Sequence, residues 1–328
     1  MQKINDLAGI GNAIVDFQFQ VDYTDLEKFK IEKGEMRIVD SDFQNLILNY
    51  LSERQLNICS GGSAANTIVA FSSFGGKASY NTILGNDKYG QFYAKEFNQL
   101  NIELVAPFIE NKSTGTCLVL ITPDSERTML TSLAVNEDFS EKYLSEELIS
   151  KANWLYLEGY KFSSPKSSKA LQTAVEMAKD NKTKISFTFS DTFITSNYKN
   201  EIEKVLEHTE LIFCNESEAL SFTGKDNPED AIKDLSNIVP NVAVTLGKNG
   251  SVIITNKQKI SIPPYPAERI DTTGAGDMYA GAFFYAMIYM NSLEKAGHLA
   301  SIASAKIVSI LGARLKENPK ELLYSLNI

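Results

Sequence analysis

The residues with the clearest chemical potential form one short run, Asp271-Thr272-Thr273-Gly274-Ala275-Gly276-Asp277, which opens an apolar stretch. Glycines on both sides of a small residue at a helix start let backbone amides converge on an anion. An aspartate in the first turn of that helix could accept the proton of an attacking hydroxyl group. An ordinary helix cap after a tight turn uses the same residue types. Seven residues in register favour an anion pocket of Gly274, Ala275 and Gly276, with Asp277 as the catalytic base.

A second glycine-containing run, Gly61-Gly62-Ser63-Ala64-Ala65-Asn66, lies in the N-terminal part of the chain. Alone, two glycines before a serine-capped helix are a common structural device. In this order and at this separation, the two runs resemble the paired signatures of the ribokinase-like (PfkB) carbohydrate kinases. The resemblance extends from Gly9 to about Arg314. It implies an ATP-dependent kinase with a three-layer α/β domain, a mostly parallel central sheet and a small β-sheet lid.

Further matches indicate which molecule accepts the phosphoryl group and which residues bind it. The segments 9–12, 114–117, 127–133 and 157–160 resemble the adenosine kinase branch of the family. On that resemblance Asp16 is the carboxylate that binds sugar hydroxyls. The ribose would be held by a set of small and polar residues, namely Asn12, Asp16, Gly62, Ser63 and Asn66.

The same resemblance implies that three residues in or near the lid bind the nucleobase of the acceptor. Met129 and Leu133, with Tyr160 nearby, would form an apolar slot for a purine, because stacking and apolar burial need few directional hydrogen bonds. Plain packing of the lid explains Met129 and Leu133 equally well. Arg127, beside the lid turn, could meet the transferred phosphoryl group, although an exposed arginine is the ordinary interpretation of a hairpin position.

The ATP side of the resemblance lies in the C-terminal half. Asn215 and Glu218 resemble an N-x-x-E motif that organises Mg²⁺ and phosphate, with contact to the ion through water, and they also fit a capping box. A turn at residues 245–250 resembles a nucleotide-binding turn and assigns ATP contacts to Thr245, Gly247 and Gly250. As a bare pattern it also fits an ordinary hairpin, so its support comes from its position before the Asp277 run. Asp271 and Thr273 match part of the family's monovalent-cation site, but residues 307–316 match poorly. The sequence therefore gives weak support for a K⁺ requirement.

The rest of the sequence supplies elements that can position these residues. Short β-rich runs alternate with longer amphipathic runs, which is typical of parallel strands joined by crossover helices. We expect strands at residues 7–15, 78–84, 154–157, 184–189, 210–214, 242–246 and 251–255. We expect helices at residues 63–74, 88–100, 165–179, 200–208, 228–238 and 277–290. This alternation predicts an α/β domain of three layers.

Two stretches, approximately residues 15–40 and 107–134, break the alternation because no helical pattern separates their strand-like runs. The second stretch contains two strand-like runs joined by the turn Pro123-Asp124-Ser125. We expect both stretches to form a small antiparallel sheet that projects from a single domain spanning residues 1–328. Because the assigned substrate residues lie near both stretches, this sheet is expected to act as a lid.

The composition excludes several classes of function. The chain has 328 residues and a net charge of −9, with 41 acidic and 32 basic side chains, which disfavours a nucleic-acid partner. No stretch approaches the roughly 20 apolar residues of a membrane span, and the N-terminus lacks the features of a secretory signal. Three widely spaced cysteines show no metal-ligand spacing. These features predict a cytoplasmic protein that acts on a small molecule.

Three functions remain open at this point. The leading one is transfer of the γ-phosphoryl group of ATP, with Mg²⁺, to the 5′-hydroxyl of a nucleoside, adenosine in the first place. The second is a sugar kinase of the same family for ribose, fructose or a keto-deoxy sugar acid. The third is a nucleoside-binding regulator without turnover, against which the intact Asp277 and glycine pocket argue. The sequence does not distinguish a monomer from a homodimer.

Overall fold

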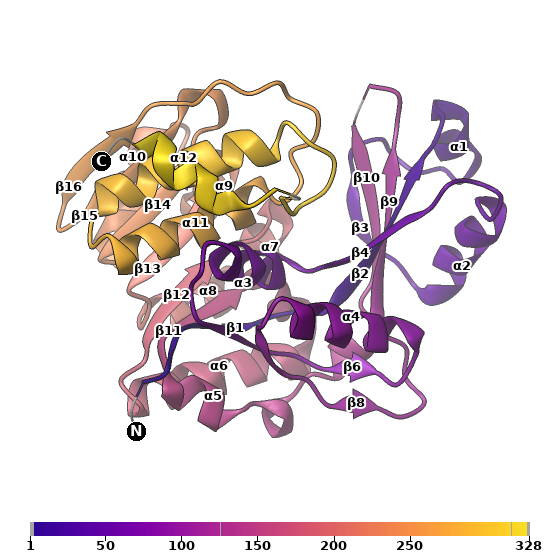
Figure 1. Ribbon diagram of the computed structural model, residues 1–328, viewed down its shortest axis with the longest axis horizontal. Coiled ribbons are helices and arrows are strands. Elements are labelled where there is room, and N and C mark those ends of the chain that lie inside the picture. Colours follow the sequence, from indigo (N-terminus) through magenta and orange to yellow (C-terminus); the bar gives the residue numbers. More distant parts are fainter. Residues whose placement is uncertain (1–2, 125, 316, 327–328) are drawn as a thin grey trace.

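The main part of the molecule is a nine-stranded sheet with helices on both faces (Figure 1). The computed structural model describes residues 3–124, 126–315 and 317–326. Strands β14, β15 and β16 pair antiparallel at one edge, and all other neighbours in this sheet are parallel. In spatial order the strands are β16 (Gln258–Ile262), β15 (Ser251–Thr255), β14 (Asn241–Thr245), β13 (Leu211–Asn215), β12 (Lys184–Thr188), β11 (Ala152–Glu158), β1 (Asn5–Ile10), β5 (Ala78–Asn81) and β7 (Glu103–Val105).

Two apolar cores lie on opposite faces of this sheet, because successive side chains of a strand point to opposite sides. In β11, Tyr156 joins one core while Leu155 and Leu157 join the other. The first core packs against α3 (Ser63–Ser73), α4 (Lys88–Gln99), α11 (Ala275–Tyr289) and α12 (Leu293–Ile307). The second packs against α5 (Glu146–Lys151), α6 (Pro165–Asp180), α7 (Thr192–Asn197), α8 (Lys199–Leu206), α9 (Glu216–Thr223) and α10 (Pro228–Ile238). The predicted three-layer α/β architecture is confirmed.

A separate five-stranded sheet forms the lid (Figure 1). Its strands, in spatial order, are β3 (Met36–Ile38), β10 (Arg127–Ser132), β9 (Gly115–Ile121), β2 (Ile14–Gln20) and β4 (Asn57–Gly61). The helices α1 (Tyr23–Lys28) and α2 (Ser41–Tyr50) lie on the side of this sheet that faces away from the main sheet. A short parallel pair, β6 (Leu84–Gly85) with β8 (Phe108–Ile109), lies beside α4.

The lid differs from its prediction in two ways. It is a mixed sheet and not a purely antiparallel one, because β2 runs parallel to β9 and β3 runs parallel to β10. Its first segment continues to Gly61, beyond the expected boundary near residue 40, since β4 pairs antiparallel with β2. The β9–β10 hairpin is antiparallel as expected, and Ser125 of its turn lies outside the described residues.

The single strand predicted at residues 7–15 is wrong, because the chain leaves the main sheet after β1 and enters the lid as β2. At the break, the amides of Asn12 and Ala13 donate to the side chains of Glu158 and Asn136, at 2.8 and 2.9 Å, and not to backbone carbonyls of a neighbouring strand. The strand predicted at 78–84 likewise ends at Asn81. Both breaks redirect the chain at the carboxyl edge of the sheet.

No helix in the described part of the chain is both long enough and apolar enough to cross a membrane.

Candidate active site

A cavity of about 460 Å³ lies between the lid and the carboxyl ends of the main strands. In an open parallel sheet, these ends meet at one edge, which is where ligands commonly bind. Polar residues at four adjacent strand ends line it, namely Glu158, Thr188, Asn215 and Thr245. The lid contributes Ile14, Asp16, Cys117, Met129 and others from the opposite side.

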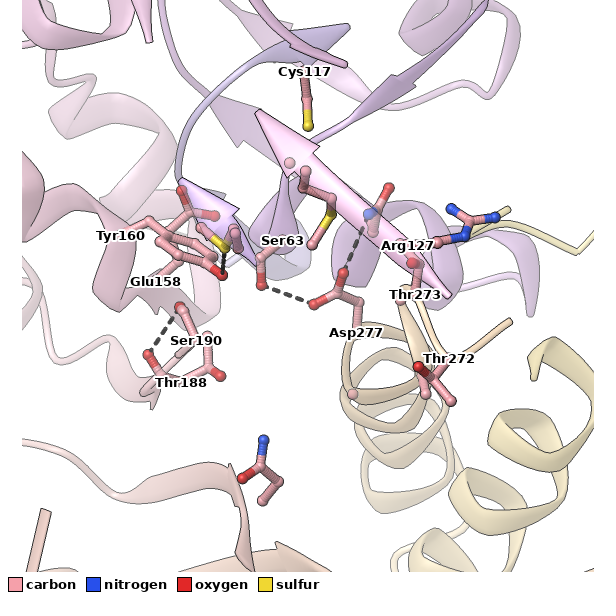
Figure 2. A pocket seen from close by; sticks show the side chains of 18 of the residues that line it. Ser63, Cys117, Arg127, Glu158, Tyr160, Thr188, Ser190, Thr272, Thr273 and Asp277 are labelled. Carbon is pink, nitrogen blue, oxygen red and sulfur yellow. Dashed lines mark hydrogen bonds between the residues drawn. The ribbon is translucent and has the colours of Figure 1, made fainter. Parts of the chain in front are cut away.

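Asp277 lies in the first turn of α11, where the sequence placed it, and its carboxylate faces the start of α3 (Figure 2). The hydroxyl of Ser63 donates to Oδ1 at 2.7 Å, and Nδ2 of Asn66 donates to Oδ2 at 3.1 Å. Burial raises the pKa of Asp277 to about 6, while these two hydrogen bonds and the charge of Arg314 act to lower it. A carboxylate with this pKa is largely deprotonated at neutral pH and can accept a proton.

The loop before α11 presents backbone amides to the same cavity. Gly274 has a φ of +73°, and a Cβ there would lie 2.5 Å from Cβ of Ala313, so only glycine fits. The amides of Gly274 and Gly276 have no acceptor within the described chain, whereas the Ala275 amide donates to the Thr272 carbonyl at 3.2 Å. Two of the three predicted amides are therefore available to an anion, and the third mainly closes the turn.

Asp271, at the start of this loop, is almost fully buried and pairs with a residue of the lid. Its Oδ1 accepts from the Thr273 amide at 2.9 Å, its Oδ2 accepts from the Gly312 amide at 2.7 Å, and Arg127 forms an ion pair with Oδ2. Arg127 is 8% exposed, so its interpretation as an exposed hairpin arginine is wrong. Its Nε and Nη1 have no hydrogen-bond partner within the described residues, and its side chain lines the cavity.

Asp16 lies on β2 in register with Cys59 on one neighbouring strand and Cys117 on the other. Burial raises the pKa of Asp16 to about 7, and the charges of Arg314 and Arg127 act to lower it. Gly62, which also lines the cavity, has a φ of +102°, and a Cβ there would lie 2.2 Å from the Asn12 carbonyl oxygen. The predicted ribose-binding residues therefore line one cavity, in which Ser63 and Asn66 contact Asp277 and Asp16 lies on the lid strand β2.

Glu158 and Lys161 are buried charged residues that sequence reasoning did not assign to the site. Glu158 accepts hydrogen bonds from the amides of Asn12 and Ala64, at 2.8 and 2.7 Å, and Lys161 donates to Oδ1 of Asn12 at 3.0 Å. Burial raises the pKa of Glu158 and lowers the pKa of Lys161. The charged residue at the end of the apolar run Leu155-Tyr156-Leu157-Glu158 was a sequence signal that could have identified Glu158.

The residues predicted to form a slot for the nucleobase lie together in an apolar part of the cavity wall. Met129, Leu133 and Tyr160 line it as expected, and Met36 and Ile38 of β3 line it as well. The Tyr160 hydroxyl lies 3.1 Å from Sδ of Met36, which connects the main domain to the lid strand β3. Sequence reasoning missed Met36 and Ile38 because β3 is only three residues long.

The residues predicted to bind ATP line the cavity only in part. Thr245, Asn215 and Glu218 line the cavity, but Gly247 and Gly250 are not among the lining residues. Gly250 has a φ of +83°, and a Cβ there would lie 2.1 Å from the Ile262 carbonyl oxygen, so the turn itself explains this glycine. Lys316, in the stretch compared for a monovalent cation, lies outside the described residues.

Asn215 and Glu218 form the capping box that the sequence allowed. Oδ1 of Asn215 accepts from the Glu218 amide at 2.9 Å, and the Glu218 carboxylate accepts from the Asn215 amide and Nδ2 at 3.1 and 2.7 Å. Burial raises the pKa of Glu218 to about 7. Within the described residues, no three His, Cys, Asp or Glu side chains are grouped to hold a metal. These oxygens therefore fit Mg²⁺ through water and not as a complete ligand shell.

Comparison with known proteins decides the family. A family model described as pfkB family carbohydrate kinase matches residues 39–321. The chain belongs to the pfkB family of carbohydrate kinases. This phosphotransferase family membership agrees with the two glycine-containing runs from which the resemblance was first inferred.

Individual relatives cover nearly the whole of this pfkB-family chain. The adenosine kinase of Saccharomyces cerevisiae is 26% identical over 309 residues, which cover 88% of this chain and 90% of the relative. The crystal structure of adenosine kinase from Sinorhizobium meliloti superposes with a TM-score of 0.91 at 27% identity, covering 98% and 99% of the two chains. A probable sugar kinase from Rhizobium etli superposes with a TM-score of 0.93 at 26% identity, covering 100% and 99%.

Proposed function

We propose that this kinase transfers the γ-phosphoryl group of ATP to the 5′-hydroxyl of a nucleoside, with adenosine as the preferred acceptor. The position of Asp277 is the main support for the proposal. Its carboxylate lies at the cavity wall beside the amides of Gly274 and Gly276, which have no acceptor among the described residues. The apolar slot of Met129, Leu133 and Tyr160, and the similarity to two adenosine kinases, support a nucleoside as the acceptor.

Asp277 orients the attacking hydroxyl group and accepts its proton as the phosphoryl group is transferred. The amides of Gly274 and Gly276 face the charge that develops on the phosphoryl oxygens, and the loop at Ala275 holds them in place. Preorganised donors of this kind are worth about 3–4 kcal/mol each when removed. Arg127 supplies the three N–H groups of Nε and Nη1, because within the described residues only its Nη2 is paired, with Asp271.

The acceptor is held by side chains that already have fixed geometry. Asn12 is fixed by Glu158 and Lys161, and Ser63 and Asn66 are fixed by Asp277 itself. Asp16 lies across the cavity, on the lid, where its carboxylate can accept hydrogen bonds from ribose hydroxyl groups. Closure of the lid over the acceptor would exclude water, which otherwise competes with the 5′-hydroxyl.

Kinases of the pfkB family use ATP with Mg²⁺. In this chain Asn215 and Glu218 would hold the hydrated ion, which supplies charge neutralisation at the nucleotide phosphates. No K⁺ is needed in the proposal, since Arg127 and the Thr273 and Gly312 amides already occupy the carboxylate of Asp271.

A sugar kinase remains the second candidate, and the superposition on the probable sugar kinase of Rhizobium etli favours it. The cavity argues against an acidic sugar. Asp16, Glu158 and Asp277 all line it, and an acceptor carboxylate among these side chains would meet like charge.

The proposal is tested by measuring ADP formation from ATP and Mg²⁺ with a panel of adenosine, inosine, guanosine, ribose, fructose and a keto-deoxy sugar acid. We expect adenosine to give the highest kcat/KM. A higher kcat/KM for ribose or fructose would replace the nucleoside assignment by the sugar kinase. Tight adenosine binding in calorimetry, without ADP formation for any acceptor, would identify a regulator that does not turn over.

A further inference from the structure

A line of four side chains connects helix α4 to the carboxylate of Asp277. Nη1 of Arg314 donates to Oε1 of Glu96 at 2.7 Å, and Nε of Arg314 lies 3.3 Å from Oδ1 of Asn66. Nδ2 of Asn66 then donates to Oδ2 of Asp277 at 3.1 Å. Arg314 thus lies directly behind the residue that holds Asp277.

The hydrogen-bonding groups of the Asn66 side-chain amide allow only one of its two orientations in this arrangement. Asn66 has one acceptor oxygen and one donor nitrogen on its side chain, and a flipped amide would turn the oxygen toward the Asp277 carboxylate. A guanidinium group has only donors, so Arg314 can bind Asn66 through the oxygen alone. We propose that Arg314 is a positioning residue that fixes the amide of Asn66 and places a positive charge behind Asp277. This inference rests on the proposed role of Asp277 as the base.

The segment that carries Arg314 is anchored to the anion pocket. The amide of Gly312 donates to Asp271 at 2.7 Å, and Ala313 packs so closely against Gly274 that no Cβ fits there. Gly312 itself has a φ of +99°, which turns the chain at this point. Arg314 therefore reaches Asn66 from the same segment that supports the amides of the pocket.

The charges around Asp277 make Arg314 important for its ionisation. Carboxylates face Asp277 from three other elements, namely Asp16 on β2, Glu158 on β11 and Glu218 on α9. The Arg314 charge lowers the pKa of Asp277 against the effect of burial. Two arginines line the cavity itself, Arg127 and Arg269, and Arg127 is paired with Asp271. Loss of Arg314 should therefore raise the pKa of Asp277.

The first experiment measures the pKa of the Asp277 carboxylate directly and needs no substrate. The protein is labelled with ¹³C at aspartate carboxyl groups, the Asp277 resonance is assigned by its loss in Asp277→Asn, and its pKa is titrated by NMR. We expect Arg314→Met to raise the pKa by about one unit, the lower end of the effect of a single nearby charge. Arg314→Lys, which keeps the charge, should restore most of the shift. An unchanged pKa in Arg314→Met would overturn the proposal.

Two further variants serve as controls. Arg54→Met removes another arginine that pairs with a carboxylate, Asp25 at 2.7 Å, but this pair lies in the lid away from Asp277, and the Asp277 pKa should not change. If Arg314→Met does not fold, Arg314→Gln takes its place, because glutamine can still bind Glu96 or Asn66 without a charge. A raised pKa in Arg314→Gln supports the proposal, and an unchanged one overturns it.

The second experiment measures turnover with the best acceptor of the wild-type enzyme. At pH 7, the raised pKa of Asp277 in Arg314→Met should lower kcat by about twofold, and loss of the contact that fixes the Asn66 amide should lower it further. The KM for ATP should stay within about twofold, because the arginine acts through the catalytic base. The acid limb of kcat/KM should move to higher pH, and Arg314→Lys should reverse this movement. Lowered kcat without movement of that limb would show a purely structural role and reject the charge effect. If the wild type phosphorylates no acceptor, the proposed function fails while the NMR titration still decides the role of Arg314.

Discussion

Arg127 of the lid strand β10 forms an ion pair with Asp271 at the start of the anion-pocket loop, and both side chains are buried. The pair joins the lid to the segment that presents the phosphate-facing amides. Because the other N–H groups of Arg127 are unpaired within the described structure, the same guanidinium can face both Asp271 and an incoming phosphoryl group.

Removing one partner of this pair should leave the other as an uncompensated buried charge. We expect Arg127→Met to lower the free energy of unfolding by about 3–5 kcal/mol. Asp271→Asn should also destabilise, and the double variant should lose less than the sum of the two single losses. Urea unfolding of the four proteins gives the coupling energy. Lys33→Met, which breaks the exposed pair with Asp124, is the control and should leave the midpoint unchanged. Additive losses would show that the two residues do not interact.

The second prediction concerns Asp277 as the catalytic base. Asp277→Asn keeps the size and polarity of the side chain but cannot accept the acceptor's proton, so kcat should fall by about a thousandfold while nucleoside binding is largely retained. ADP formation and calorimetric binding of adenosine measure the two effects. Asp230→Asn is a matched control, since Asp230 also lies in the first turn of a helix but is exposed. Turnover within about tenfold of the wild type would remove Asp277 from the role of base.

The pH dependence of kcat/KM should report two raised carboxylate pKa values. Burial raises the pKa of Asp277 to about 6 and that of Asp16 to about 7, and both groups act in their deprotonated form. Activity is therefore present above these values and lost as the pH falls through them. Between the two values log kcat/KM should rise with pH with a slope near one, and below both values the slope should approach two. In Asp16→Asn only the Asp277 ionisation should remain, with a slope of one. A profile that is flat between pH 5 and pH 8 is incompatible with both assignments.

The apolar slot can be tested by comparing two acceptors. Met129→Ala removes apolar surface that a base would cover, and we expect kcat/KM for adenosine to fall about five- to twentyfold, equivalent to about 1–2 kcal/mol. The weaker turnover of free ribose should not change, because ribose has no base. Met177→Ala on α6, remote from the cavity, is the control. An equal effect on adenosine and ribose would mean that Met129 only packs the lid.

The sequence could predict much of the fold because its signals are local. The apolar periodicity of the helices and the short β-rich runs follow from which face of each element is buried, and α3, α4, α6 and α11 lie close to their expected positions. Helix α12 was missed because its buried face consists mainly of small residues, such as Ala296, Gly297 and Ala300, which give a weak hydrophobic signal. The pairing of β4 with β2 is a long-range contact that periodicity alone cannot contain.

The site shows the same division between local and long-range information. Asp277 and Gly274 could be predicted because they lie in one short run whose residue types indicate a tight turn and a helix start. The contacts of Glu158 with Asn12 and Ala64 join segments that are far apart in the sequence, and so does the contact of Arg314 with Asn66. The only local sequence signal for Glu158 was a charged residue at the end of an apolar strand. No local sequence signal pointed to Arg314. At Gly250 the turn alone explains the glycine, and its contact with ATP stays a prediction.

The final prediction separates the two glycines of the anion pocket. In Gly274→Ala a residue with a side chain would have to adopt a φ of +73° and place its Cβ 2.5 Å from that of Ala313. We expect a loss of about 2–4 kcal/mol in the free energy of unfolding, from backbone strain and overpacking, together with loss of turnover. Gly276→Ala is the matched control for stability, because a Cβ there meets nothing within 4 Å. Alanine also favours the helix there, so its stability should be unchanged or slightly higher. Urea unfolding of both variants decides the matter, and equal stabilities would show that the loop is not held against Ala313 in solution.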